Sequence, residues 1–198
     1  MKVGIFGGTF DPPHLGHLQL AEACVAHGLD LVLWVPNHQN PLKGETIASA
    51  EDRLEMVRLM IEDQPQMAVS DVEITREGPS FMVETLEELK VAQPDWDLWL
   101  ILGADSLANF LDWHYPERII RMAKLAVAVR PGTDLDALIE AQPDLIRDRL
   151  DLVEMEPFPA SSTDARAQLA ASEPARALHA RVAEYIAERR LYALTPNF

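Results

Sequence analysis

The chain has 198 residues, of which 48% are hydrophobic and 25% are charged, a balance typical of a soluble protein with its own core. It carries 17 basic and 32 acidic side chains, so its formal net charge is −15, which argues against binding to nucleic acid or to an anionic membrane surface. Cys24 is the only cysteine, which excludes an intramolecular disulfide, and we expect neither a signal peptide nor a membrane-spanning segment. We therefore expect a cytoplasmic protein with a single domain over residues 1–198, whose oligomeric state no pattern indicates.

Short apolar runs alternate along the chain with segments of helical periodicity. Strands are expected at residues 3–6, 29–35, 67–74 (continuing as an extended segment), 98–102, 125–129 and 152–155. Helices are expected at residues 14–27, 49–62, 79–91, 105–111, 116–123, 135–150 with a break at Pro143, 163–171 and 174–189. This order predicts a Rossmann-like α/β fold, in which helices cover both faces of a doubly wound parallel sheet and a helical C-terminal segment spans about residues 157–198. Such sheets bind ligands at the carboxyl ends of their strands, where the strand order reverses.

The first predicted strand ends in a glycine pair, and a helix begins a few residues later. Gly7 and Gly8 allow the backbone to approach a ligand closely, and Thr9 adds a hydroxyl and an amide. His14 and His17 share one face of the first helical turn, where free N–H groups favour anions and imidazoles can donate to phosphate oxygens. The segment lacks the features of a Walker A loop and of the dinucleotide fingerprint. No cysteine or third histidine lies at ligand spacing, so no metal site is predicted.

Two further segments combine a strand end with a helix start. Ser162, Thr163 and Arg166 would bring two hydroxyls and a guanidinium to a helix N-terminus, which makes a second anion site, although an N-cap with an incidental arginine has the same pattern. Gly103 ends the most apolar strand, and Asp105 follows it. The Asp105 carboxylate can accept a hydrogen bond from a ribose hydroxyl or can cap the next helix.

Aromatic and basic residues near the predicted ligand edge also have two interpretations. Phe81, Phe110 and Trp113 flank this edge, where a flat heteroaromatic ring can stack on the indole of Trp113, but core packing accounts for most such residues. Lys43 lies in a polar loop and Arg130 follows a strand. Each of these two side chains can meet a phosphate or remain a solvated charge.

The sequence resembles the bacterial nicotinate-nucleotide adenylyltransferases. Gly7 to His17 is similar to their Gly-Gly-x-Phe-Asp-Pro-x-His-x-Gly-His signature, whose His-x-Gly-His core is shared by the wider nucleotidyltransferase superfamily. Further matching motifs follow in order: Pro36-Asn37, Pro79-Ser80-Phe81 with Thr85, Gly103 to Ser106, Trp113, Arg130-Pro131-Gly132, and Ser161 to Arg166. The resemblance covers most of the chain, and several ordered motifs are far more specific than one.

The resemblance implies the transfer of AMP from ATP to nicotinate mononucleotide, giving deamido-NAD and pyrophosphate, with Mg²⁺ accompanying ATP and no covalent enzyme intermediate. His14, His17 and Arg166 would be catalytic. The residues implied to bind ATP are Gly7, Gly8, Thr9, Phe10, His14, His17, Gly103, Asp105, Ser162, Thr163 and Arg166. Those implied to bind the mononucleotide are Asn37, Lys43, Ser80, Phe81, Met82, Thr85, Trp113, His114 and Arg130. The pyridine ring would stack on Trp113, and its carboxylate would meet backbone amides near Met82 and His114.

The sequence departs from the family pattern in two motifs. Phe81 stands where tyrosine is usual and Met82 where threonine is usual, which changes little if these positions act through their backbone. Ala165 replaces the usual isoleucine, and Asp164 before it would weaken anion binding unless its carboxylate points away. Alternative functions are an adenylyltransferase for another acceptor, such as nicotinamide mononucleotide or phosphopantetheine, or a nucleotide sensor without catalysis.

Overall fold

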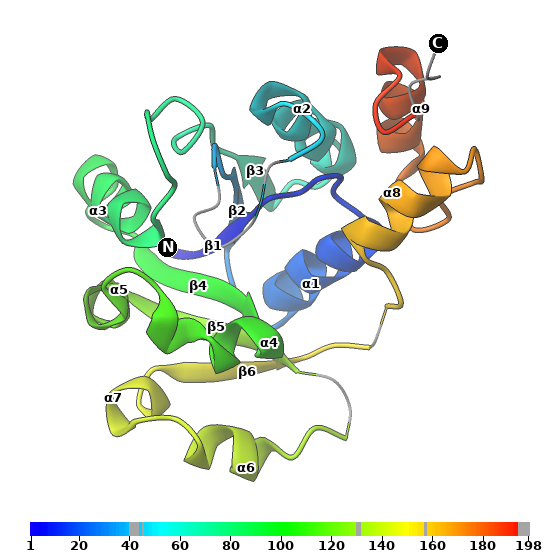
Figure 1. Ribbon diagram of the computed structural model, residues 1–198. Coiled ribbons are helices and arrows are strands. Elements are labelled where there is room, and N and C mark those ends of the chain that lie inside the picture. Colours follow the sequence, from blue (N-terminus) through cyan, green and yellow to red (C-terminus); the bar gives the residue numbers. More distant parts are fainter. Residues whose placement is uncertain (40–43, 45, 130–131, 157, 194–198) are drawn as a thin grey trace.

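The computed structural model describes residues 1–39, 44, 46–129, 132–156 and 158–193, and its centre is a parallel sheet (Figure 1). The strands of the described residues are β1 (Lys2–Gly8), β2 (Leu31–Pro36), β3 (Met67–Val69), β4 (Asp97–Gly103), β5 (Ala123–Val129) and β6 (Leu150–Glu154). Their order across the sheet is β3-β2-β1-β4-β5-β6, so the direction of winding reverses between β1 and β4. The predicted doubly wound parallel sheet is confirmed.

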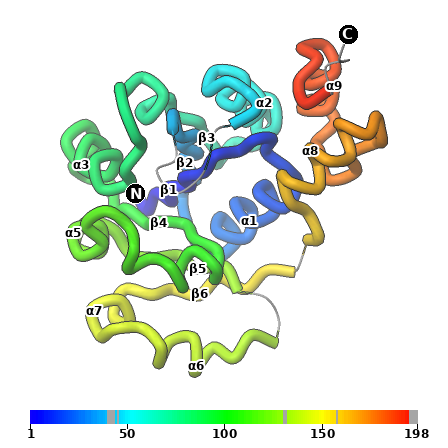
Figure 2. Tube along the Cα trace, viewed as in Figure 1, coloured from blue at the N-terminus to red at the C-terminus, as the bar shows by residue number. Residues whose placement is uncertain are grey.

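Helices cover both faces of this sheet, as the tube in Figure 2 also shows. They are α1 (Leu15–Ala26), α2 (Ala50–Ile61), α3 (Met82–Ala92), α4 (Ala104–Ala108), α5 (Pro116–Met122), α6 (Leu135–Glu140), α7 (Asp144–Arg147), α8 (Ser162–Ala170) and α9 (Ala180–Arg189), with a 3₁₀ turn at Phe110–Asp112. Val3 and Ile5 of β1 point into a core shared with α3, α4, α5 and α7. Phe6 belongs to the opposite core, which is shared with α1, α2, α8 and α9. Successive strand residues point to opposite faces, so each strand contributes to both cores.

The switch between β1 and β4 opens the sheet at its carboxyl edge. The two strands pair only from Lys2 opposite Asp97 to Ile5 opposite Leu100, although both continue for three more residues. Beyond Ile5 the strand β1 stays paired with β2 as far as Gly8. The unpaired ends of β1 and β4 therefore separate, and a ligand can enter between them.

The bounds of several predicted elements differ from those in the structure, and three of these differences have a clear physical cause. The strand expected at 67–74 ends at Val69, and residues 71–75 form a turn, because its neighbour β2 stops at Pro36 and offers no further ladder. The helix expected at 105–111 is divided at Asn109, whose side-chain amide donates to the carbonyl of Asp105 at 2.9 Å in competition with the backbone. The helix expected from residue 174 begins only at Ala180. The preceding turn instead accepts a hydrogen bond from the N–H of Leu15 through the carbonyl of Ala177, at 2.8 Å.

The helices of the described residues are short. None of them is both long and apolar enough to cross a bilayer.

Candidate active site

A cavity of about 690 Å³ lies where β1 and β4 separate. Its wall includes the strand ends Phe6 to Gly8 and Ile101 to Gly103, together with the segment before α3 and the segment between α4 and α5. The predicted site residues that line it are Gly7, Gly8, Thr9, Asn37, Ser80, Phe81, Met82, Gly103, Asp105, Trp113 and His114. The topology thus brings together residues that are spread over more than half of the sequence.

The side of the cavity formed by the α3 and α5 region is aromatic. The rings of Phe81 and His114 are 4.3 Å apart, and the ring of Tyr115 lies 4.1 Å from that of His114. Trp113 lies 5.5 Å from the buried ring of Phe110, which supports the indole from the core. A flat ring entering the cavity therefore meets π surfaces.

His14 and His17 form a reciprocal cap at the start of α1. The N–H of His14 donates to Nδ1 of His17 at 3.1 Å, and the N–H of His17 donates to Nδ1 of His14 at 3.3 Å. Their rings stack with centroids 3.6 Å apart. Since each Nδ1 accepts a hydrogen bond, a neutral ring carries its proton on Nε2. Burial lowers the pKa of His14 to about 4, so this side chain is a neutral N–H donor at physiological pH.

The first residues of α8 reach back to the loop between β1 and α1. The hydroxyl of Ser162 donates to the carbonyl of Pro12 at 2.9 Å, and Nη1 of Arg166 donates to the carbonyl of Asp11 at 2.6 Å. Nη2 of Arg166 also donates to the hydroxyl of Thr163 at 3.3 Å. Hydroxyl and guanidinium groups thus gather beside the paired histidines, although about 150 residues separate the two segments.

Asp164 does not point toward this cluster as a free anion. Its carboxylate accepts a hydrogen bond from the hydroxyl of Ser161 at 2.7 Å, and the same hydroxyl accepts one from the N–H of Asp164 at 3.0 Å. This reciprocal pair caps the N-terminus of α8. Ala165 is fully buried, and a small side chain allows α8 to pack closely.

Arg53 supports the floor of the site from α2 and is completely buried. Its Nη1 donates to the carbonyl of Thr9 at 2.6 Å, and its Nη2 donates to the carbonyls of Asn37 and His38 at 2.7 and 3.1 Å. Burial lowers its pKa, and the nearby Asp11 counteracts this effect. The Asn37 amide donates to the hydroxyl of Thr9 at 3.3 Å. One guanidinium therefore joins the ends of β1 and β2.

Comparison with known proteins identifies the family. The cytidylyltransferase-like family model matches residues 5–168. A protein of Herpetosiphon aurantiacus named probable nicotinate-nucleotide adenylyltransferase is 41% identical over 195 residues, covering 96% of this chain and 98% of its own length. One of the same name from Symbiobacterium thermophilum is 42% identical over 199 residues, covering 96% of this chain and 95% of its own length. The chain belongs to the nicotinate-nucleotide adenylyltransferase family.

Solved structures give the same fold. The structure of Plasmodium falciparum nicotinic acid mononucleotide adenylyltransferase complexed with NaAD has a TM-score of 0.78 to this chain at 17% identity, covering 96% of this chain and 97% of that one. The crystal structure of a putative nicotinate-nucleotide adenylyltransferase from Vibrio parahaemolyticus has a TM-score of 0.71 at 22% identity, covering 98% of this chain and 96% of that one. At this identity the likeness confirms the Rossmann-like fold alone.

Several residues that the family motifs suggest as ligand contacts lie elsewhere. Phe10 is buried in the core, where its ring packs 5.1 to 5.4 Å from those of Phe6, His17 and Trp34. Thr85 is also fully buried, and its hydroxyl donates to Glu73 at 2.6 Å. Five further predicted site residues do not line the cavity and lie around the β1–α1 loop. They are His14, His17, Ser162, Thr163 and Arg166. Lys43 and Arg130 lie outside the described residues.

Sequence reasoning missed Arg53 and Glu73. Arg53 lies on the apolar stripe of α2, one turn before the buried Met56 and Val57. Helical periodicity therefore places Arg53 on the buried face, and this signal was present in the sequence. Glu73 lines the cavity although only 3% of it is exposed, and burial raises its pKa more than the hydrogen bond from Thr85 lowers it. Nothing in the local sequence distinguishes Glu73 from a solvated glutamate.

Proposed function

We propose that this chain transfers the adenylyl group of ATP to nicotinate mononucleotide, releasing pyrophosphate and forming deamido-NAD. The observation that carries the proposal is the position of an aromatic cavity, at the switch point of the sheet, next to a loop surrounded by imidazole, hydroxyl and guanidinium groups that can bind phosphate. The names of the relatives support the same reaction. Geometry and family membership thus agree on a reaction that needs a flat base, a ribose and several phosphates in one place.

The ATP phosphates bind at the start of α1. The Nε2–H groups of His14 and His17 donate to phosphate oxygens, and Ser162, Thr163 and Arg166 of α8 approach from the other side. The neutral ring of His14 keeps its Nε2–H as a hydrogen-bond donor. The reciprocal cap holds both rings in position before the substrate arrives. Such preorganised donors stabilise the charge that develops in the transition state.

The adenosine lies between the ends of β1 and β4. Its phosphates run along the end of β1, at Gly7, Gly8 and Thr9. The opposite side is lined by the end of β4, at Gly103 and Asp105. Phe10 contributes through packing, because its buried ring fills the space beside Gly8 and leaves no room for a Cβ atom there.

The pyridine mononucleotide occupies the aromatic part of the cavity, with its ring on Trp113. Phe81, which takes the place of the usual tyrosine, makes no side-chain hydrogen bond to the start of α3, so the amides near Met82 are available to a carboxylate. Asn37 and Ser80 provide polar contacts, and His114 closes the wall beside Phe81. Thr85 acts indirectly through Glu73. Lys43 and Arg130 remain proposed contacts of the mononucleotide phosphate.

Mg²⁺ is proposed to accompany the triphosphate. Among the described residues no group of three or more His, Cys, Asp or Glu side chains is arranged to hold a metal ion. We propose that phosphate oxygens and water provide most ligands of the ion. The ion would neutralise phosphate charge. We further propose that the chain acts in the cytoplasm and that residues 1–198 form one domain.

The decisive experiment is product analysis of the protein with ATP, Mg²⁺ and one acceptor at a time. Nicotinate mononucleotide should give deamido-NAD and an equal amount of pyrophosphate, and nicotinamide mononucleotide should react more slowly. Phosphopantetheine should give no product, which separates the two acceptor classes. Tight ATP binding with no dinucleotide from any acceptor would refute the proposal in favour of a nucleotide sensor.

A further inference from the structure

Asp11 lies in the middle of the loop that joins β1 to α1, and its carboxylate is buried. Three donors surround it. The N–H groups of Ile47 and Ala48 bind Oδ2 and Oδ1 at 2.9 and 3.1 Å, and the hydroxyl of Tyr192 binds Oδ1 at 2.6 Å. Two backbone amides before α2 and one side chain from the end of the chain are therefore tied to the same loop.

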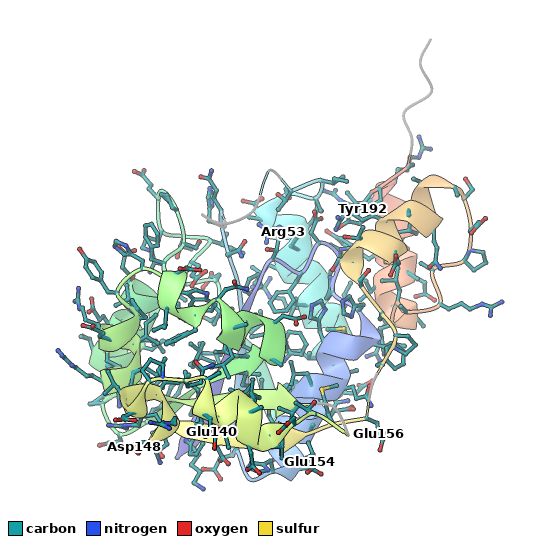
Figure 3. The ribbon with its side chains drawn as sticks, turned by 60° about the horizontal axis from the view of Figure 1, so that its bottom comes forward. Arg53, Glu140, Asp148, Glu154, Glu156 and Tyr192 are labelled. Carbon is teal, nitrogen blue, oxygen red and sulfur yellow. The ribbon has the colours of Figure 1, made fainter. Side chains whose placement is uncertain are left out.

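Tyr192 reaches this position because the chain reverses after α9. Arg190 and Tyr192 both have positive φ, 54° and 62°, and the N–H of Leu191 donates to the carbonyl of Ile186. The turn folds Tyr192 back against the protein, where only 6% of it is exposed. Arg53 and Tyr192 lie at the same end of the molecule in Figure 3. Burial and the bond to Asp11 raise the pKa of Tyr192, so its hydroxyl remains a donor at physiological pH.

Helix α8 also holds this loop. Arg166 donates to the carbonyl of Asp11 itself, and Ser162 donates to the carbonyl of the next residue. A guanidinium has five N–H groups, so Arg166 can keep this bond and still bind phosphate. Bonds to the side chain and to the carbonyl of Asp11 thus link Tyr192 to Arg166 through one residue.

We propose that Tyr192 is a positioning residue, which through Asp11 fixes the β1–α1 loop so that His14 and Arg166 meet the ATP phosphates together. The inference rests on the proposed roles of those two residues in ATP binding. It assigns to the turn after α9 a positioning function at a phosphate site formed by the β1–α1 loop and α8. An unfixed loop would still allow the mononucleotide to bind, because its aromatic pocket does not include Asp11 or Tyr192.

The test compares Tyr192→Phe with Tyr185→Phe. Tyr185 lies on α9 and also donates its hydroxyl to a carboxylate, that of Asp52 at 2.8 Å, but Asp52 belongs to α2 and not to the loop. Each variant loses one hydroxyl that binds a carboxylate. We expect Tyr192→Phe to lower kcat about tenfold and to raise KM for ATP, while KM for the mononucleotide stays within about twofold. Tyr185→Phe should leave all three parameters within about twofold of the wild type.

Asp11→Ala removes the acceptor of the same bond, because both carboxylate oxygens are lost. It should also lower kcat, and the double variant with Tyr192→Phe should lose little more than the worse single variant, because both remove one coupling. Normal kinetics in Tyr192→Phe, an equal loss in Tyr185→Phe, or fully additive effects in the double variant would overturn the positioning role. If the wild type forms no dinucleotide, the proposed function fails separately. The ATP affinities of the same variants, measured by calorimetry, then test the positioning role.

Discussion

Arg53→Met removes the guanidinium that joins β1 to β2 and leaves a side chain of similar length in α2. The substitution leaves the carbonyls of Thr9, Asn37 and His38 without this donor in a buried place. At about 1 to 1.5 kcal/mol for each lost partner, the free energy of unfolding should fall by about 3 to 5 kcal/mol. Removing a desolvated charge offsets part of this loss, but the three carbonyls remain buried, so the net effect is destabilising.

Urea unfolding of the variant measures this loss directly. A decrease of about 3 kcal/mol is a large part of the stability of an ordinary domain and corresponds to a melting temperature about 10 °C lower. The matched control is Arg58→Met, on the same helix, because Arg58 is half-exposed and bonded only to Glu55 at 3.4 Å among the described contacts. The control should change the unfolding free energy by less than about 0.5 kcal/mol. Equal midpoints for the two variants would refute the structural role of Arg53.

Three further predictions concern the proposed reaction and its pH dependence. His17→Ala should lower turnover at least ~10²-fold in a folded protein, as expected for one lost transition-state donor, and unchanged turnover in steady-state assays would contradict that role. Trp113→Ala should raise KM for nicotinate mononucleotide about tenfold and leave KM for ATP nearly unchanged; a larger effect on ATP would place the pyridine ring elsewhere. His14 has a folded pKa of about 4, below its unfolded value, so the unfolded chain binds more protons between these values and stability falls as pH falls through that window. Wild type should therefore lose about 2 kcal/mol more than His14→Gln between pH 7 and pH 5 in denaturant titrations, and parallel losses would show that His14 is not buried as a neutral ring.

Local signals in the sequence were sufficient where a single turn decides the structure. The glycine pair at the end of β1 and the helix starts expected at residues 49 and 163, which the structure places at Ala50 and Ser162, were predicted from residues within one turn of each other. Prediction failed where a contact with a segment distant in the sequence determines the bounds of an element. The start of α9 is delayed because the residues before it bind the N-terminus of α1, and β3 is short because its neighbour ends in proline.

The site residues divide in the same way. Gly7, Gly8 and Thr9 were found because their backbone role shows in the sequence, and the fold places them on the cavity wall. Arg53 and Tyr192 were not found, because a charged or phenolic side chain is normally solvated and only tertiary packing makes it a buried donor. Their importance follows from the carbonyl and carboxylate groups that they satisfy, which belong to residues of the first motif.

The net charge of −15 does not conflict with a site for two anionic substrates, because the charges near the proposed phosphate site are arranged differently from those of the whole molecule. The carboxylates of Asp11 and Asp164 are both occupied by donors. Figure 3 shows a group of exposed acidic side chains at the opposite end of the view from Arg53 and Tyr192, namely Glu140, Asp148, Glu154 and Glu156. Charges separated by more than about 8 Å in physiological salt are largely screened. The global charge therefore affects the approach of nucleic acids and membranes, which touch a wide surface, far more than it affects a nucleotide at the proposed phosphate site between α1 and α8.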